Sequence, residues 1–445
     1  MKIYQKGDKK LLNAWAFYDW ANSVYPLVIS TAIFPIYYGF ITDENKYIEF
    51  LGFNFKNTAL ITFVTAIAFM FLVFITPLLS GIADYTGLKK TFMKFFCFIG
   101  SVATISLYWF DIDNLTFGLF FYFLAMIGFW GSLVFYNSYL PDIAYEDQQD
   151  SISAKGYSMG YFGSVLLLIL NLVMVNFPDL FGISDVGTTQ APIMAMKISF
   201  VTVGVWWFVF SLYTFYYLPE PKKTSKINTS ILFNGFKELR EVWIILKSHP
   251  FLKSYLLAFF IYSIALQTVI LVATYFGEQE INWAEGEKTT GLIISILIIQ
   301  LIAILGALVS AKISEKFGNI YTLIILNIMW ALLCFYGYFV ESSNEFYIAA
   351  GLVGLVMGGI QALSRSTFSK FLPETDNTTS FFSFYDVAQK VSIVLGMILF
   401  GTIDQITGSM RNAILFFTVF FAIGAFLLIR LDKKNEMLNL SWHRY

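Results

Sequence analysis

Long apolar runs alternate with short polar segments along the whole chain. In the first half, uncharged or nearly uncharged runs occupy 20–42, 58–80, 95–110, 114–141, 156–178 and 198–219. The second half holds six more, at 254–277, 289–311, 317–340, 346–364, 380–403 and 412–429. A helix needs roughly 20 apolar residues to cross a bilayer. The pattern therefore predicts twelve membrane-spanning helices, the first of them starting near Leu12. Barrel-type alternation is absent, so the expected fold class is all-α integral membrane.

A polar segment over 220–253 separates the first six runs from the last six. It predicts two pseudo-symmetric six-helix bundles, 1–219 and 254–445 with a short tail, joined by a cytoplasmic linker. Within the linker, apolar residues recur at helical spacing with basic residues between them: Leu232, Phe236, Leu239, Trp243 and Leu246, with Lys237, Arg240 and Lys247. This pattern predicts an amphipathic helix on the inner leaflet. A plain helix that ties the two halves together and a regulatory role explain it equally well.

Basic residues are concentrated on one side of the predicted spans. With a cytoplasmic amino terminus, the inside segments hold 23 of the 29 lysines and arginines, and the outside segments hold 5. Because cytoplasmic loops carry an excess of positive charge, both termini are expected in the cytoplasm.

The composition fits the same class. The chain is 57% hydrophobic and only 13% charged, against about 25% charged in soluble domains. A net charge of −1 and the lack of a basic tract give no reason to expect a nucleic-acid partner. Cys97 and Cys334 both lie in apolar runs, so neither a disulfide framework nor a metal site is expected, and no cofactor is predicted.

A charged hairpin follows the second span. The ten residues 81–90 read Gly81-Ile-Ala-Asp84-Tyr-Thr-Gly87-Leu-Lys89-Lys90. Two glycines, one acid and a basic pair predict a tight, solvated turn between two membrane helices.

This hairpin has an echo in the second half. Asp84 and Gly87 have counterparts in Glu315 and Gly318, 231 residues later. Leu140-Pro-Asp, closing the fourth span, returns as Leu372-Pro-Glu at an offset of 232. Two matches at nearly one offset predict a duplicated six-helix unit. The second hairpin lacks the first glycine and the basic pair, so gating contacts are expected from the first copy.

The first span carries a polar and aromatic stripe. Trp15, Tyr18, Asp19, Asn22 and Pro26 share one helix face by the i, i+3, i+4 rule. An ionised group inside a membrane costs at least ~2.5 kcal/mol, so Asp19 needs an explanation. It either titrates as a coupling proton site, binds a substrate ammonium, or is a structural carboxylate paired with a basic residue.

Further polar candidates lie in later spans. Asp386 and Lys390 are four residues apart in the eleventh span and can pair on one helix face, mainly as a structural pair. Arg365, near the cytoplasmic end of the tenth span, either snorkels to the interface or locks an inner gate. Gln361 and Asn137 are expected to line a polar path or to hydrogen-bond a neighbouring helix.

Other functional classes lack their sequence signals. The chain has no phosphate-binding loop of an ATP-driven pump, no nucleophile with a base, no histidine in a span and no repeated pore filter. No catalytic residues are predicted. A secondary transporter remains, with a non-transporting receptor or scaffold of the same fold as the alternative.

Three motifs carry a family resemblance. The 81–90 hairpin resembles the signature loop of the major facilitator superfamily (MFS). The runs Trp15-Ala-Phe-Tyr-Asp19-Trp-Ala-Asn22-Ser and Gly359-Ile-Gln-Ala-Leu-Ser-Arg365-Ser resemble one branch of it, the "unknown major facilitator" branch. That branch includes the fungal vacuolar amino-acid effluxers of the autophagy pathway.

The resemblance implies an alternating-access transporter of a small solute, with amino acids the best guess and protons a candidate coupling ion. On this hypothesis Asp19, Tyr18 and Asn22 contribute to the cavity. Gln361 and Arg365 form its cytoplasmic side, and Asp386 and Lys390 are a charge pair near it. Asp84, with Lys89 and Lys90, would stabilise one gating state. A monomer in a bacterial plasma membrane is expected, with the lipid bilayer and a small-molecule substrate as partners.

Overall fold

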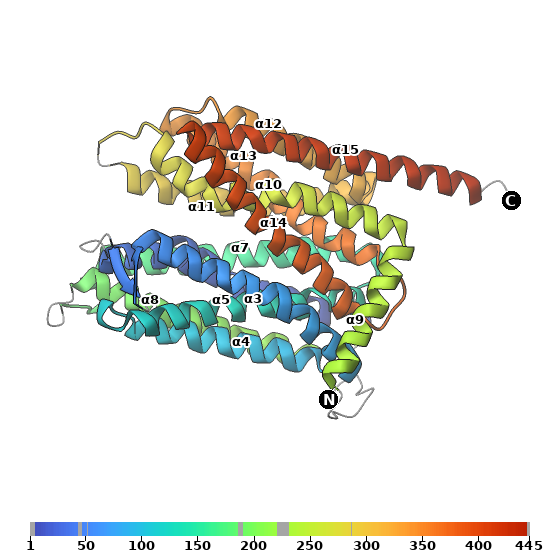
Figure 1. The fold of residues 1–445 in the computed structure, drawn as a ribbon, viewed down its shortest axis with the longest axis horizontal. Helices are drawn as coiled ribbons and strands as arrows, with labels where there is room; N and C mark the ends of the chain where they lie inside the picture. Colours follow the sequence, from blue (N-terminus) through green and yellow to red (C-terminus); the bar gives the residue numbers. More distant parts are fainter. Residues whose placement is uncertain are drawn as a thin grey trace. The chain divides into compact units, whose positions relative to one another are not determined.

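Helices dominate the chain. The computed structural model describes residues 5–42, 47–50, 52–185, 190–219, 231–285 and 287–442. In these residues twelve helical segments are long and apolar enough to cross a membrane, six before helix α9 and six after it (Figure 1). The prediction of twelve spans is confirmed. The beginning of the predicted linker, 220–230, lies outside the described residues.

The first six spans are assembled from short and long helices. They are α1 (Lys9–Asn22) with η1 (Tyr25–Ile33) and α2 (Phe34–Thr42); α3 (Asn57–Thr86); α4 (Lys89–Ser106) with η2 (Leu107–Trp109); η3 (Ile112–Asn114) with α5 (Leu115–Asn137) and α6 (Leu140–Ile143); α7 (Glu146–Asn176); and α8 (Ala191–Tyr217). A small antiparallel hairpin of β1 (Tyr47–Phe50) and β2 (Phe53–Lys56) follows the first span, and η4 (Pro178–Phe181) follows the fifth.

The second half is simpler. After α9 (Ile231–Ser248) come α10 (Pro250–Glu280), α11 (Lys288–Phe317), α12 (Asn319–Gly337), α13 (Ser343–Lys370), α14 (Thr378–Thr407) and α15 (Met410–Trp442). Each of these six includes one span, and the α15 span ends at Lys433.

The described residues form two compact units. The first contains Asp8–Asn137 and Met159–Gly235, and the second contains Gln5–Gly7, Ser138–Ser158 and the chain from Phe236 onward. The segment Ser138–Ser158, which comprises α6 and the first turns of α7, thus packs within the second unit. The predicted division at 219 and 253 stays a prediction.

Helix pairing repeats between the two units. In the first unit α4 packs against α5 and α8, α1 against α8, and α3 against α5. In the second unit α12 packs against α13 and α15, α10 against α15, and α11 against α13. The same spans of each half are paired, which supports the duplication inferred from the sequence offset.

Glycines bring α11 and α13 into close contact. A Cβ added at Gly354 would lie 2.4 Å from the Ile299 carbonyl oxygen, and one at Gly358 would lie 2.0 Å from that of Ala303. Both distances are far below van der Waals contact, so only glycine permits this helix spacing.

Candidate functional site

The signature hairpin is mostly helical, contrary to the expected solvated loop. Helix α3 continues through Gly81 and Asp84 to Thr86, and α4 begins at Lys89. Only Gly87 and Leu88 make the turn. Gly87 has a φ of +72°, and one residue in this left-handed conformation is enough to end a helix.

The charges of this hairpin are also less solvated than expected. Lys89 and Lys90 are buried at 4% and 3% exposure, and Lys90 Nζ donates to the Leu218 carbonyl, 2.7 Å away. Asp84 is half-buried in the last turn of α3. Gly81 lets helix α3 pass close to helix α9, since a Cβ at this position would lie only 2.3 Å from the Gly235 carbonyl oxygen.

Asp19 lies in the first unit beside an aromatic platform. The Tyr136 hydroxyl from α5 donates to Asp19 Oδ2 over 2.8 Å. Trp15 stacks on Tyr136 with ring centroids 4.5 Å apart, and its indole Nε1 donates to the Tyr136 carbonyl over 2.9 Å. Asp19 is 5% exposed. The Asp19 carboxylate is therefore held in place by a tyrosine donor within a cluster of aromatic side chains.

Tyr18 and Asn22 of this span are buried as well, as is Tyr25, which was not predicted, whereas Pro26 is half-buried. In the described part of the chain, the Tyr18 hydroxyl, the Asn22 Nδ2 and the Tyr25 hydroxyl lack a hydrogen-bond partner. Directly after Asn22, residues Tyr25–Ile33 are wound as a π-helix that includes Pro26. Proline has no N–H to donate, and π-helical segments are frequent at functional sites.

Asp386 and Lys390 form the expected pair on one face of α14. Lys390 Nζ donates to Asp386 Oδ2, and Lys390 is fully buried. The neighbouring Tyr385 stacks on Phe259 of α10, with ring centroids 4.1 Å apart. Pairing one turn apart neutralises both charges inside the span.

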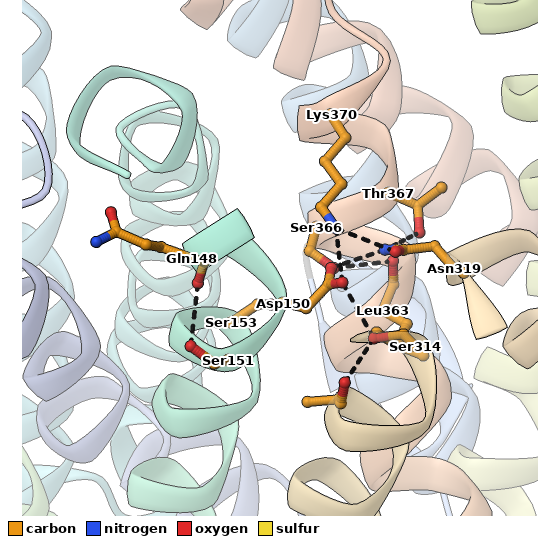
Figure 2. Close-up of polar contacts among 12 residues, drawn as sticks. Gln148, Asp150, Ser151, Ser153, Ser314, Asn319, Leu363, Ser366, Thr367 and Lys370 are labelled. Carbon is orange, nitrogen blue, oxygen red and sulfur yellow. Dashed lines mark hydrogen bonds and ion pairs between the residues drawn. The ribbon is translucent and has the colours of Figure 1, made fainter. Parts of the chain in front are cut away.

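A second charged site, the Asp150 cluster, lies within the second unit and was not predicted. Figure 2 shows Asp150 of α7 facing Ser314, Asn319, Thr367 and Lys370. Asp150 accepts from Ser314 Oγ at 3.0 Å, from Asn319 Nδ2 at 2.7 Å and from Lys370 Nζ at 2.6 Å. Asn319 also bonds Thr367 at 3.0 Å and Lys370 at 3.1 Å. The cluster therefore joins α7, α11, α12 and α13.

Burial and charge make this cluster strong. The Asp150 side chain is 3% exposed and that of Lys370 is 23% exposed. Charge-assisted hydrogen bonds are shorter and about twice as strong as neutral ones. A buried carboxylate that loses its partners, however, costs several kcal/mol. The assembled arrangement is therefore costly to break.

The rest of the same α7 face continues the contact. Ser153, Ala154, Tyr157 and Ser158 follow Asp150 at helical spacing. Ala154 packs in a buried cluster of alanines with Ala307 and Ala311 of α11 and Ala362 of α13. The Ser158 hydroxyl donates to the Ile304 carbonyl of α11 over 3.4 Å. Small side chains let this face lie close to α11 and α13.

Arg365 is bound by this face and does not snorkel. Its Nε donates to Ser153 Oγ and its Nη2 to the Ser153 carbonyl, both at 2.9 Å. Its guanidinium carbon lies 4.3 Å above the Tyr157 ring, a cation–π contact. Arg365 is 2% exposed. The adjacent Ser364 accepts from Tyr255, through its carbonyl over 2.8 Å.

Two weaker candidates are less informative. Gln361 lies half-buried on α13, one turn before Arg365, and Asn137 is the half-buried last residue of α5. Both make polar interactions. Their roles stay predictions.

The sequence did contain a signal for the unpredicted cluster. One face of α7 carries polar and small residues where a core helix would be apolar. Its members follow the i, i+3, i+4, i+7, i+8 pattern: Asp150, Ser153, Ala154, Tyr157 and Ser158. Asn319 directly follows Gly318, whose φ of +84° repeats that of Gly87. The second hairpin, expected to be the lesser one, thus supplies a member of the cluster.

Twelve apolar spans in two sets of six, with paired charges buried inside them, define a polytopic membrane protein of the transporter type. The family described as "Vacuole effluxer Atg22 like" matches residues 7–440, and the chain belongs to this family. The uncharacterized MFS-type transporter YxiO of Bacillus subtilis is 30% identical over 425 residues, 95% of each chain. Autophagy-related protein 22 of Saccharomyces cerevisiae is 26% identical over 427 residues, 84% of this chain and 78% of the relative.

Solved structures agree on the fold. The proton:xylose symporter XylE aligns with a TM-score of 0.71 at 13% identity, covering 95% of both chains. The Escherichia coli fucose:proton symporter FucP aligns at 0.66 and 15% identity, covering 95% and 97%. The chain therefore has the MFS fold. Its relatives support membrane transport as the function, and no catalytic family is indicated.

Proposed function

We propose that the protein is a secondary transporter that moves a small zwitterionic solute, with amino acids the best candidates, by alternating access. The observation that carries this proposal is the set of buried contacts along one α7 face, from the Asp150 cluster to Arg365. Such contacts, made in one conformational state and lost in another, set the free-energy difference between the two states.

In this mechanism the α7 face separates from α11 and α13 when the protein opens toward the cytoplasm. Asp150 then exchanges Lys370, Asn319 and Ser314 for water, and Arg365 leaves Ser153. The first hairpin acts in parallel, with Asp84, Lys89 and Lys90 stabilising one of the two states.

The substrate class follows from the pair in α14. Asp386 and Lys390 present one carboxylate and one ammonium a single turn apart. A zwitterion can exchange with both, its ammonium on Asp386 and its carboxylate on Lys390, without leaving a net buried charge. The family description, a vacuole effluxer, agrees with a metabolite as cargo.

Asp19 is the candidate coupling group. Its carboxylate is buried, holds a tyrosine donor and lies one turn from Asn22, so protonation there removes an unfavourable intramembrane charge. Gln361 and Asn137 contribute polar lining. The proposed location is a bacterial inner membrane with both termini inside, and a monomer is the working unit. A non-transporting receptor of the same fold is the alternative.

The test is flux in proteoliposomes with radiolabelled amino acids and an imposed pH gradient. We expect accumulation that collapses when the gradient is removed. Asp19→Asn should abolish gradient-driven accumulation but keep exchange of internal for external substrate. Lys390→Met and Asp386→Asn should each abolish exchange. Flux by no amino acid, at normal membrane abundance, would favour the receptor. Full accumulation by Asp19→Asn would exclude Asp19 as the coupling residue.

A further inference from the structure

Helix α9 exposes an unusual face for a helix that does not cross the membrane. It is not among the twelve segments apolar enough to span. Yet Phe233 is 72% exposed and Phe236 is 60% exposed, and Trp243 and Ile244 are exposed beside them. These four side chains share one face by helical spacing. Exposed apolar patches of this kind mark an interaction site.

Basic residues lie within the same face. Lys237, Arg240 and Lys247 are exposed between the apolar side chains, and Lys247 Nζ lies 5.0 Å from the centre of the Trp243 ring. One acid joins them, Glu241, at 4.0 Å from Lys237. Over 220–253 the chain has seven basic and three acidic residues, whereas its overall charge is −1. Positive charge is therefore concentrated around α9.

The opposite face of α9 is held by the protein. Val242 and Leu246 are buried. Glu238 Oε2 accepts from Asn377 Nδ2 over 2.9 Å, just before α14 begins. At the edge of the exposed face, Trp243 also stacks on Phe384 of α14, with ring centroids 5.6 Å apart. Burial, with Glu241 nearby, raises the pKa of Glu238. Because α9 is docked on one side, its exposed face has a fixed orientation.

We infer that the exposed face of α9 binds the surface of a membrane that contains acidic lipids. An interfacial helix combines aromatic and aliphatic side chains, which enter the headgroup region, with lysines and arginines that attract anionic headgroups. Each basic residue near such a surface contributes about a five-fold gain in binding. Through Asn377 and Phe384, α9 also contacts the beginning of α14, the helix that carries Asp386 and Lys390. Membrane binding by α9 therefore acts on the helix that holds this charge pair.

The test is amide hydrogen exchange of residues 231–248 in the full-length protein. The protein is placed in nanodiscs of phosphatidylcholine alone or of phosphatidylcholine mixed equally with phosphatidylglycerol. We expect exchange in α9 to be on the order of ten-fold slower with the anionic lipid, and the difference to shrink in high salt.

Two variants make the comparison specific. Arg240→Gln with Lys247→Gln should remove most of the lipid difference, whereas the matched control Lys312→Gln with Lys316→Gln, also exposed, should keep it. Phe233→Ser with Phe236→Ser should speed exchange in both lipids. Equal protection of α9 in the two nanodiscs, at low salt, would overturn the inference. So would a lipid difference that survives the Arg240 and Lys247 substitutions.

Discussion

At the scale of single residues, the buried carboxylates differ in how their charge is satisfied. The charge of Asp386 is neutralised by Lys390, which lies one turn away on the same helix. Asp150 depends on donors from three other helices. The first arrangement can be read from spacing alone. The second cannot, because Ser314, Asn319 and Lys370 lie more than 160 residues away in sequence from Asp150.

Removing the Asp150 carboxylate should destabilise the protein. Asp150→Ala removes the carboxylate that Lys370 and Asn319 share and leaves them only neutral acceptors, Asn319 Oδ1 and Thr367 Oγ1. We expect a loss of about 2 kcal/mol. The midpoint of thermal unfolding in detergent measures this. Adding Lys370→Leu should recover part of the loss, because no lone buried charge remains. Asp147→Ala, an exposed acid one turn earlier, is the control and should change nothing. Equal midpoints for Asp150→Ala and the control would contradict this account.

At the scale of helices, the spans followed from hydrophobicity, but their ends did not. Helix α4 begins six residues before the apolar run predicted to start at residue 95, because the buried stems of Lys89 and Lys90 extend it. Likewise α3 runs through the hairpin expected to be a loop. Charged residues in a sequence predict the end of a membrane span only if their side chains are solvated in the folded protein. Here tertiary packing buries Lys89 and Lys90, so the boundary prediction failed at this hairpin.

The α11–α13 contact offers a clean prediction at this scale. Gly358→Ala places a methyl group 2.0 Å from the Ala303 carbonyl oxygen, so the helices must separate. We expect a loss of about 1–3 kcal/mol, seen as lower yield and a lower unfolding midpoint. Gly351→Ala, on the same helix, meets nothing closer than 3.8 Å and should be neutral or stabilising. Similar effects of the two substitutions would show that this close contact does not matter.

At the scale of the whole molecule, the duplicated sequence has produced paired helices but unequal hairpins. Gly87 and Gly318 both end a helix with positive φ, yet different residues follow them. After Gly87 come Leu88 and two buried lysines. After Gly318 comes Asn319, whose amide bridges Asp150, Thr367 and Lys370. The repeat therefore preserves a positive-φ glycine at the turn, while each copy has its own polar contacts.

If the Asp150 cluster holds one transport state, its loss should change how often the α7 face is exposed. Ser158→Cys on that face, 8% exposed in the structure, serves as a reporter. In inside-out vesicles, a membrane-impermeant maleimide should label it slowly in an otherwise native background. Adding Asp150→Ala should destabilise the closed state relative to the open state by about 2 kcal/mol. Labelling should then be roughly 30-fold faster. Cys97 and Cys334 are buried, and their alanine variants set the background.

The comparison with Asp147→Ala separates a state change from general loosening, because that exposed acid shares the helix but not the cluster. A destabilised Asp150→Ala protein with unchanged labelling would mean that the cluster is merely structural. Faster labelling that a bound substrate slows again would mean that substrate and cluster bias the same equilibrium. Because Asp150→Ala depopulates the closed state, it should then also weaken substrate binding, by a factor no larger than the gain in labelling rate. Substrate affinity and labelling rate should therefore be measured on the same variants, because the mechanism requires the two to change together.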